Sequence, residues 1–172
     1  MSNQPRAIRV TRPVAAGAPA LSDFLANLDN HWDLCDDAVE ITSLGGPVDR
    51  PSEALLMLRG PLGIRRAART RLLGATAKKV WGRAQLGNGT QARVTWRFAP
   101  KRGTTEVELE LELRDARLFD RWLFALVRPW VTGQLSRALD RLAEIAAIAA
   151  EQLGPNALTP HPYSPTSKES LQ

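Results

Sequence analysis

ARVTWRFAPKRGTTEVELELEL, residues 92 to 113, decides the fold of this 172-residue chain. Apolar residues alternate with arginine or threonine as far as Phe98, and after the turn at 100–103 they alternate with glutamate. A period of two places each set on one face of a strand. The stretch therefore predicts a hairpin with one apolar face and with arginines opposite glutamates on the other, each such pair contributing roughly 0.2–1 kcal/mol.

Five more segments before this hairpin alternate or run apolar, and turns containing glycine or proline separate most of them. These predicted strands are residues 6–14, 39–42, 54–59, 64–73 and 79–86. An apolar stripe from Leu21 to Leu28 predicts a short helix after the first strand, and a second short helix begins near Asp29. We expect the seven strands to form one curved antiparallel sheet.

One long helix closes the chain, and we predict it over residues 117–153 from its helical spacing of apolar residues. Pro129 lies inside it and predicts a kink or a break near Val127. Residues 154–172 are rich in proline and poor in apolar side chains. We therefore expect one domain over residues 6–153, followed by a disordered tail over 154–172.

The first part of this helix, residues 118–131, is apolar almost all round. Such a helix is buried, or it touches a membrane or a partner. We expect Leu118, Trp122 and Leu126 to be buried, with Phe119 and Phe124 near the mouth of a cavity.

Composition restricts the class of protein. The 44% hydrophobic and 24% charged residues are typical of a globular protein, and no apolar run is long enough to span a bilayer. The polar first residues lack the apolar core of a signal peptide, which predicts a cytoplasmic protein. Cys35 is the only cysteine, so an internal disulfide and a cysteine-based metal site are excluded.

Positive charge is concentrated in the middle of the chain. No acidic residue occurs between Glu53 and Glu106, and the last strand supplies too few to neutralise that window. The surplus consists of Arg65, Arg69, Arg71, Lys78, Lys79 and Arg83. It indicates a solvated surface, or contact with an anionic membrane or an acidic partner. No groove-reading motif or interleaved aromatic residue predicts binding of nucleic acid.

Few residues suggest catalysis. The only histidines are His31 and His161, and His161 falls in the predicted tail, so no Ser-His-Asp or Cys-His set can be assembled. His31 lies at a helix boundary, where we expect a surface or capping role, and it has too few partners for a metal site. Tyr163, the only tyrosine, is also in the tail, and no motif for a cofactor is present.

Arg66 is the charged residue that alternation places on the apolar face of its strand. A charge there is unfavourable unless it is paired or hydrated. Arg66 either holds a ligand carboxylate or polarises a carbonyl, or it reaches solvent at the strand end. The inward face of strand 79–86 stays open between two sets, Val80, Gly82 and Ala84 or Trp81, Arg83 and Gln85.

The order of these elements resembles the helix-grip arrangement. Three stretches carry the resemblance, VTRPVAA at 10–16, NLDNHW at 27–32 and GNGTQARVTWRF at 87–98. They are similar to the SRPBCC superfamily, which includes the START lipid-transfer domains, the birch-pollen allergen and the bacterial polyketide cyclase/dehydrase group. The spacing of His31 and Trp32 departs from the pattern common there.

The resemblance implies an α+β fold in which a seven-stranded curved antiparallel sheet wraps around a long C-terminal helix, with two short helices after the first strand. It implies a bacterial protein that binds a small hydrophobic ligand, a lipid or polyketide-like molecule, between sheet and helix without a cofactor. The alternatives are a polyketide cyclase or dehydratase, and a structural or regulatory module filled by its own side chains. The candidate cavity residues are Trp32, Leu56, Arg66, Trp96, Phe98, Phe119, Trp122 and Trp130.

Overall fold

The computed structural model describes residues 7–31, 33–34 and 38–153. Its strands are β1 (Ala7–Val14), β2 (Val39–Gly45), β3 (Glu53–Arg59), β4 (Arg65–Thr76), β5 (Lys79–Leu86), β6 (Gln91–Lys101) and β7 (Thr104–Arg114). Its helices are α1 (Ala18–Leu25) and α2 (Leu118–Leu153), with short 3-10 helices η1 (Leu28–His31) and η2 (Pro61–Gly63). Trp32, Cys35 and the predicted tail lie outside the described residues.

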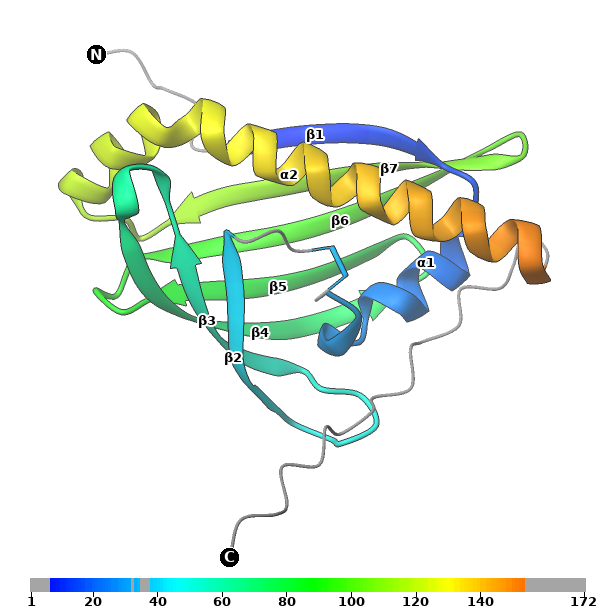
Figure 1. Ribbon diagram of the computed structural model, residues 1–172, viewed down its shortest axis with the longest axis horizontal. Coiled ribbons are helices and arrows are strands. Elements are labelled where there is room, and N and C mark those ends of the chain that lie inside the picture. The colour runs from blue at the N-terminus through cyan, green and yellow to red at the C-terminus, as the bar shows by residue number, and fades with distance from the viewer. Residues whose placement is uncertain (1–6, 32, 35–37, 154–172) are drawn as a thin grey trace, which may run out of the picture.

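The seven strands form a single antiparallel sheet in the order β1-β7-β6-β5-β4-β3-β2. Figure 1 shows the sheet curving around α2, which crosses its concave side, with α1 beside the C-terminal half of that helix. The α+β helix-grip fold predicted from the order of elements is confirmed.

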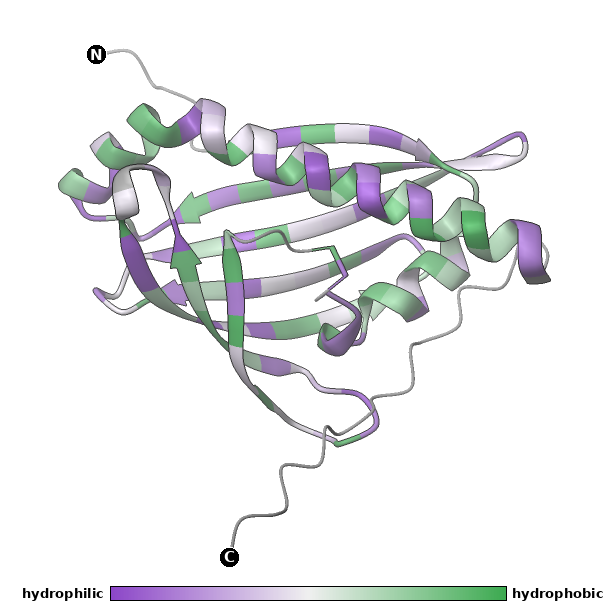
Figure 2. Cartoon of the chain, in the orientation of Figure 1, coloured by the Kyte–Doolittle hydropathy of each residue, from purple (hydrophilic) through white to green (hydrophobic). Residues whose placement is uncertain are grey.

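The β6–β7 hairpin has the register that its alternation predicts. Arg97 lies opposite Glu108 and Phe98 opposite Val107, and the striped colouring of these strands is visible in Figure 2. Arg97 forms ion pairs with both Glu108 and Glu110 on the outer face. Glu110 is only 6% exposed because Arg9 of β1 contacts it from the other side, at 3.1 Å. Burial raises the pKa of Glu110, and the two arginines more than reverse that effect, so its pKa is lowered.

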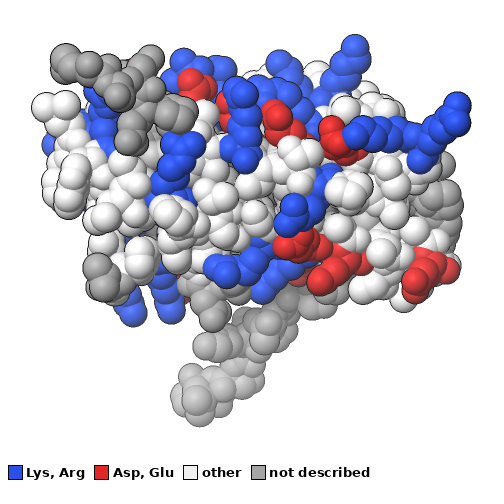
Figure 3. Space-filling model, turned by 90° about the horizontal axis from the view of Figure 1, so that it is seen from above, with Lys and Arg blue, Asp and Glu red and all other residues white. Residues whose placement is uncertain are grey.

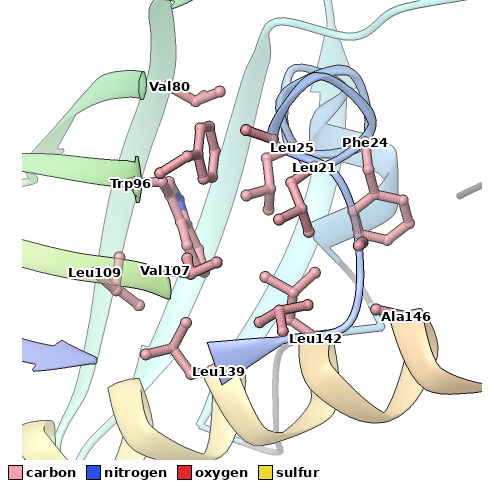
Figure 4. Packing of buried hydrophobic residues seen from close by; sticks show 14 of the residues in the cluster. Leu21, Phe24, Leu25, Val80, Trp96, Val107, Leu109, Leu139, Leu142 and Ala146 are labelled. Carbon is pink, nitrogen blue, oxygen red and sulfur yellow. The ribbon is translucent and has the colours of Figure 1, made fainter. Parts of the chain in front are cut away.

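The larger of two clusters of buried hydrophobic residues lies under the C-terminal half of α2. Leu139 and Leu142 of α2 meet Leu21 and Leu25 of α1, and all four side chains are fully buried. Figure 4 shows them packed against Trp96 and its neighbours on the sheet. Tight packing at this end anchors α2, and the cavities described below lie under its other half.

Helix α2 is continuous through Pro129, so the predicted break is not found. Its axis changes direction in the yellow stretch of Figure 1 that contains this proline, as expected where a backbone hydrogen bond is missing. No helix among the described residues combines enough length with enough hydropathy to cross a membrane.

The burial expected for Leu118, Trp122 and Leu126 is wrong, because these side chains are 82%, 63% and 61% exposed. Because this part of the helix is apolar all round, the spacing of its apolar residues does not indicate which face is buried. The buried residue of this first turn is Asp120, which pairs with Arg66 inside the cup. With Asp120 on the inner side of α2, Leu118, Trp122 and Leu126 lie on its outer side.

Candidate ligand cavity

Two adjoining cavities separate the concave sheet from the first half of α2. The first has a volume of about 270 Å³ and is lined from η1, β2–β7 and the middle of α2. The second has a volume of about 300 Å³ and reaches the N-terminal turns of α2 and the loop after β3. Six lining residues are common to both, Val39, Leu58, Ala84, Leu111, Gln134 and Leu135. The two cavities therefore form one extended hollow.

Strand alternation supplies most of the wall. Ala68, Thr70 and Leu72 of β4 line the first cavity, and Ile64 and Arg66 line the second, as their shared parity predicts. The inward face of β5, which the sequence left open, is the less polar of its two alternatives. It consists of Val80, Gly82 and Ala84, and Trp81 also contributes to the first cavity. The wall is consequently made mainly of aliphatic and aromatic groups.

Four of the eight candidate cavity residues line the hollow. Leu56 and Trp96 belong to the first cavity, whereas Arg66 and Trp130 belong to the second. These residues come from β3, β6, β4 and α2, so only the tertiary structure brings them together.

The other four candidates lie elsewhere or outside the described residues. Phe98 is buried in the hydrophobic cluster under α1 and the C-terminal half of α2. Phe119 and Trp122 are more than 60% exposed on the outer side of α2, with their ring centroids 6.2 Å apart. Trp32 is not among the described residues. Phe119 and Trp122 thus do not contribute to either cavity.

One corner of the second cavity is polar. Asp120 accepts hydrogen bonds from Arg66 (2.7 Å), from the Asn88 amide (2.7 Å) and from the Thr90 hydroxyl. Burial raises the pKa of the Asp120 carboxyl, but the bonds from Thr90, Arg66 and Asn88 outweigh it and the pKa is lowered. The carboxylate is therefore ionised at neutral pH, and it ties the start of α2 to β4 and to the β5–β6 turn.

His31 lines the first cavity and was not predicted to do so. Its Nε2–H donates to the carbonyl oxygen of Leu25, the last residue of α1, at 2.9 Å, and its ring meets the Trp96 ring edge-on at 6.1 Å. Burial lowers the pKa of the imidazole more than this hydrogen bond raises it, so the ring is neutral at physiological pH. His31 is half-buried, and its hydrogen bond to the last residue of α1 agrees with the capping role expected of it.

The residues of the basic surplus are all exposed, and one of them, Arg71, also lines the first cavity. Arg71, Arg83 and Arg93 sit directly opposite one another across β4, β5 and β6, and all three are exposed. Arg71 is also paired with Glu53 at 3.1 Å.

The chemistry available to a ligand in the hollow is limited. Among the residues that the structure describes, no three His, Cys, Asp or Glu side chains are grouped so that they could hold a metal ion. Arg66 carries five N–H donors, and its hydrogen bond to Asp120 uses one nitrogen. The hollow can therefore enclose an apolar body and donate hydrogen bonds to an oxygen atom at one corner.

Comparison with solved structures identifies the fold. A START superfamily protein from Mycobacterium smegmatis matches 86% of this chain and 98% of its own, with a TM-score of 0.54 and 17% identity. This chain has the START-like helix-grip fold. A protein from Rhodobacter sphaeroides matches 83% of the chain and 93% of its own, with a TM-score of 0.60 and 17% identity.

A third structure that matches is a protein of the dynemicin biosynthetic locus. The match covers 87% of this chain but only 48% of that one, with a TM-score of 0.53 and 11% identity. No protein-family model and no curated protein sequence matches the chain. At these identities the likeness establishes the START-like fold alone.

Proposed function

We propose that this chain binds a small hydrophobic molecule, a lipid or a polyketide-like compound, in the hollow between the sheet and α2. The observation that carries the proposal is the pair of adjoining cavities of about 270 and 300 Å³ with largely apolar walls. Ligand sites in proteins typically measure about 300–1,000 Å³ and are lined mainly by apolar groups with a few polar ones. A cup filled by its own side chains, the third alternative, would not leave this space.

The polar corner specifies one feature of the ligand. Arg66, predicted either to contact a ligand carboxylate or carbonyl or to reach solvent, has its charge neutralised by Asp120 at 2.7 Å. A ligand carboxylate would therefore be repelled by Asp120 as well as attracted by Arg66. A neutral oxygen, such as a ketone or hydroxyl, accepts from the guanidinium without that repulsion. The site accordingly favours an apolar molecule with a neutral oxygen at one end.

The geometry supports binding more than proton transfer. A cyclase or dehydratase acting by acid–base chemistry needs a group that gives or takes a proton near neutral pH. Both oxygens of Asp120 already accept hydrogen bonds, and its lowered pKa makes it a weak base. His31 donates its Nε2–H to the Leu25 carbonyl, and burial lowers its pKa, so its remaining nitrogen, Nδ1, is a weaker base than that of an ordinary histidine. Catalysis by orientation alone remains the second candidate function, favoured by the donor at Arg66.

Filling the hollow tests the proposal directly. Ala84 belongs to both cavities, so Ala84→Leu reduces the space in each. Ala67 is an exposed residue on the outer side of β4, and Ala67→Leu adds the same atoms where no ligand would bind. The probe is N-phenyl-1-naphthylamine, a neutral apolar dye whose fluorescence increases in an apolar site.

We expect the unchanged protein and Ala67→Leu to bind the dye equally. In Ala84→Leu the added side chain and the dye together overpack the hollow, which costs about 1–3 kcal/mol, so the dye should bind about tenfold more weakly. Thermal unfolding checks that both variants are folded. Equal dye affinity in the two variants would contradict a ligand site in the hollow. Native mass spectrometry of the purified protein then identifies what natural molecule, if any, is retained.

A further inference from the structure

The outer side of the first turns of α2 exposes an unusual set of side chains. Leu118, Phe119, Trp122 and Leu126 are 82%, 62%, 63% and 61% exposed. They fall within nine consecutive residues of one helix, and the rings of Phe119 and Trp122 lie against each other at 6.2 Å. Single exposed apolar residues are ordinary, but a contiguous exposed group indicates an interaction surface.

These residues lie on one side of the helix. With about 100° of rotation per residue, they share a sector about 120° wide with Ala125 and Pro129, which are also exposed. We call this set the apolar stripe: Leu118, Phe119, Trp122, Ala125, Leu126 and Pro129. The opposite side of the same turns faces the second cavity through Leu123, Phe124 and Val127. Burial of the inner side therefore leaves the stripe outward.

Basic residues border the apolar stripe. Arg117 and Arg121 are exposed and lie along one edge of the sector. The acidic residue of these turns, Asp120, points inward and is neutralised by Arg66. Figure 3 shows blue and white atoms at the left end of the molecule, where Figure 1 places the start of α2, with most of the red atoms farther along. Asp115, just before the helix, is the exposed acid closest in sequence.

We propose that this end of α2 docks onto an anionic lipid bilayer, with the apolar stripe in the headgroup region and Arg117 and Arg121 on lipid phosphates. An apolar sector bordered by basic residues is the form of a helix that lies in the plane of a membrane interface. Tryptophan is enriched at that depth, and each basic residue near an anionic surface strengthens binding about fivefold. A second copy of the chain fits the stripe less well, because each copy carries a net charge of +5.

The test is co-sedimentation of the full chain with vesicles of phosphatidylcholine alone or mixed with phosphatidylglycerol, at low salt. We expect sedimentation with the anionic vesicles, weaker sedimentation with the neutral ones, and release at high salt. Phe119→Ser/Trp122→Ser removes two anchors and should weaken binding about tenfold or more. Arg117→Gln/Arg121→Gln should weaken binding to anionic vesicles by about tenfold or more.

Matched controls separate docking from general stickiness. Ile148→Ser removes a 56% exposed apolar residue at the other end of the same helix, and Arg102→Gln removes an exposed charge from the β6–β7 turn. Both should sediment like the unchanged protein. All the replaced side chains are exposed, so circular dichroism should report folded variants.

Two results would overturn the proposal. One is that the unchanged protein stays in solution with anionic vesicles, and the other is that Ile148→Ser weakens binding as much as Phe119→Ser/Trp122→Ser. A dimer in light scattering that Phe119→Ser/Trp122→Ser dissociates, without vesicle binding, would assign the stripe to a second copy instead. Ligand binding in the hollow is measured separately with Ala84→Leu, so either proposal can fail alone.

Discussion

Replacing Asp120 by alanine should destabilise the protein by about 3 kcal/mol at neutral pH. Thr90 is 1% exposed, so its hydroxyl would lose its acceptor without gaining water, at about 1–3 kcal/mol. Removing one partner of a buried ion pair costs about 3–5 kcal/mol. The Arg66 side chain is 27% exposed, so water recovers part of that loss. The two costs concern the same carboxylate and overlap, which leaves about 3 kcal/mol.

Asp140→Ala is the matched control on the same helix. Asp140 pairs with Arg12 at 2.8 Å, but both side chains are about half exposed. Exposed pairs contribute about 0–1 kcal/mol, so this variant should unfold close to the unchanged protein. The assay is urea unfolding followed by far-ultraviolet circular dichroism, in which a shift of the midpoint at constant slope reports stability.

The pH dependence of the loss provides a second check. The folded pKa of Asp120 is lowered, so its stabilisation is complete above the unfolded pKa of about 3.9 and is lost as pH falls through the folded pKa. The difference between the unchanged protein and Asp120→Ala should therefore be constant between about pH 5 and 7 and shrink below about pH 4. A loss no greater than that of Asp140→Ala, or one that does not change with pH, would refute the assigned role of Asp120.

Three further predictions concern His31, Gly133 and Gly82. Burial lowers the folded pKa of His31, so the unfolded state takes up its proton first and stability should fall as pH drops through about 6.5. His31→Gln keeps a donor for the Leu25 carbonyl, and thermal unfolding at a series of pH values should show a melting temperature that depends less on pH. An unchanged dependence would mean that other groups cause the loss of stability. A Cβ at Gly133 would meet no atom within 4 Å, so Gly133→Ala should add about 0.8–1 kcal/mol. A Cβ at Gly82 would lie 2.8 Å from the Arg71 carbonyl oxygen, so Gly82→Ala should cost about 1–3 kcal/mol; equal midpoints in urea would contradict both assignments.

The strand region was largely predictable because its signal is local. Alternation in the β6–β7 hairpin specified which side chains face inward and that arginines lie opposite glutamates on the outer face, as Arg97 does opposite Glu108. The same period placed Arg66 on the inner side of β4, where it lines the second cavity. Neighbours two residues apart in a strand share a face whatever the rest of the fold does.

The first half of α2 was predicted as a helix but in the wrong orientation. Apolar residues occur on all sides of this half of the helix, so its sequence alone does not distinguish a buried face from an exposed one. In the structure, the face of α2 that carries Asp120 points inward, where Asp120 contacts the guanidinium of Arg66, 54 residues earlier in the chain. A pattern that repeats every few residues gives no information on a contact between residues as far apart in the chain as Arg66 and Asp120.

The amino-acid sequence alone thus determined the succession of strands along the chain, the inward faces of β4 and of the β6–β7 hairpin, and the extent of the terminal helix. The tertiary structure alone decided that Leu118, Phe119 and Trp122 lie outside, that His31 lies beside Trp96, and that the hollow has one polar corner. The physical reason is distance along the chain. Strand and helix periods arise between neighbours, whereas a cavity and a buried ion pair exist only where distant segments meet.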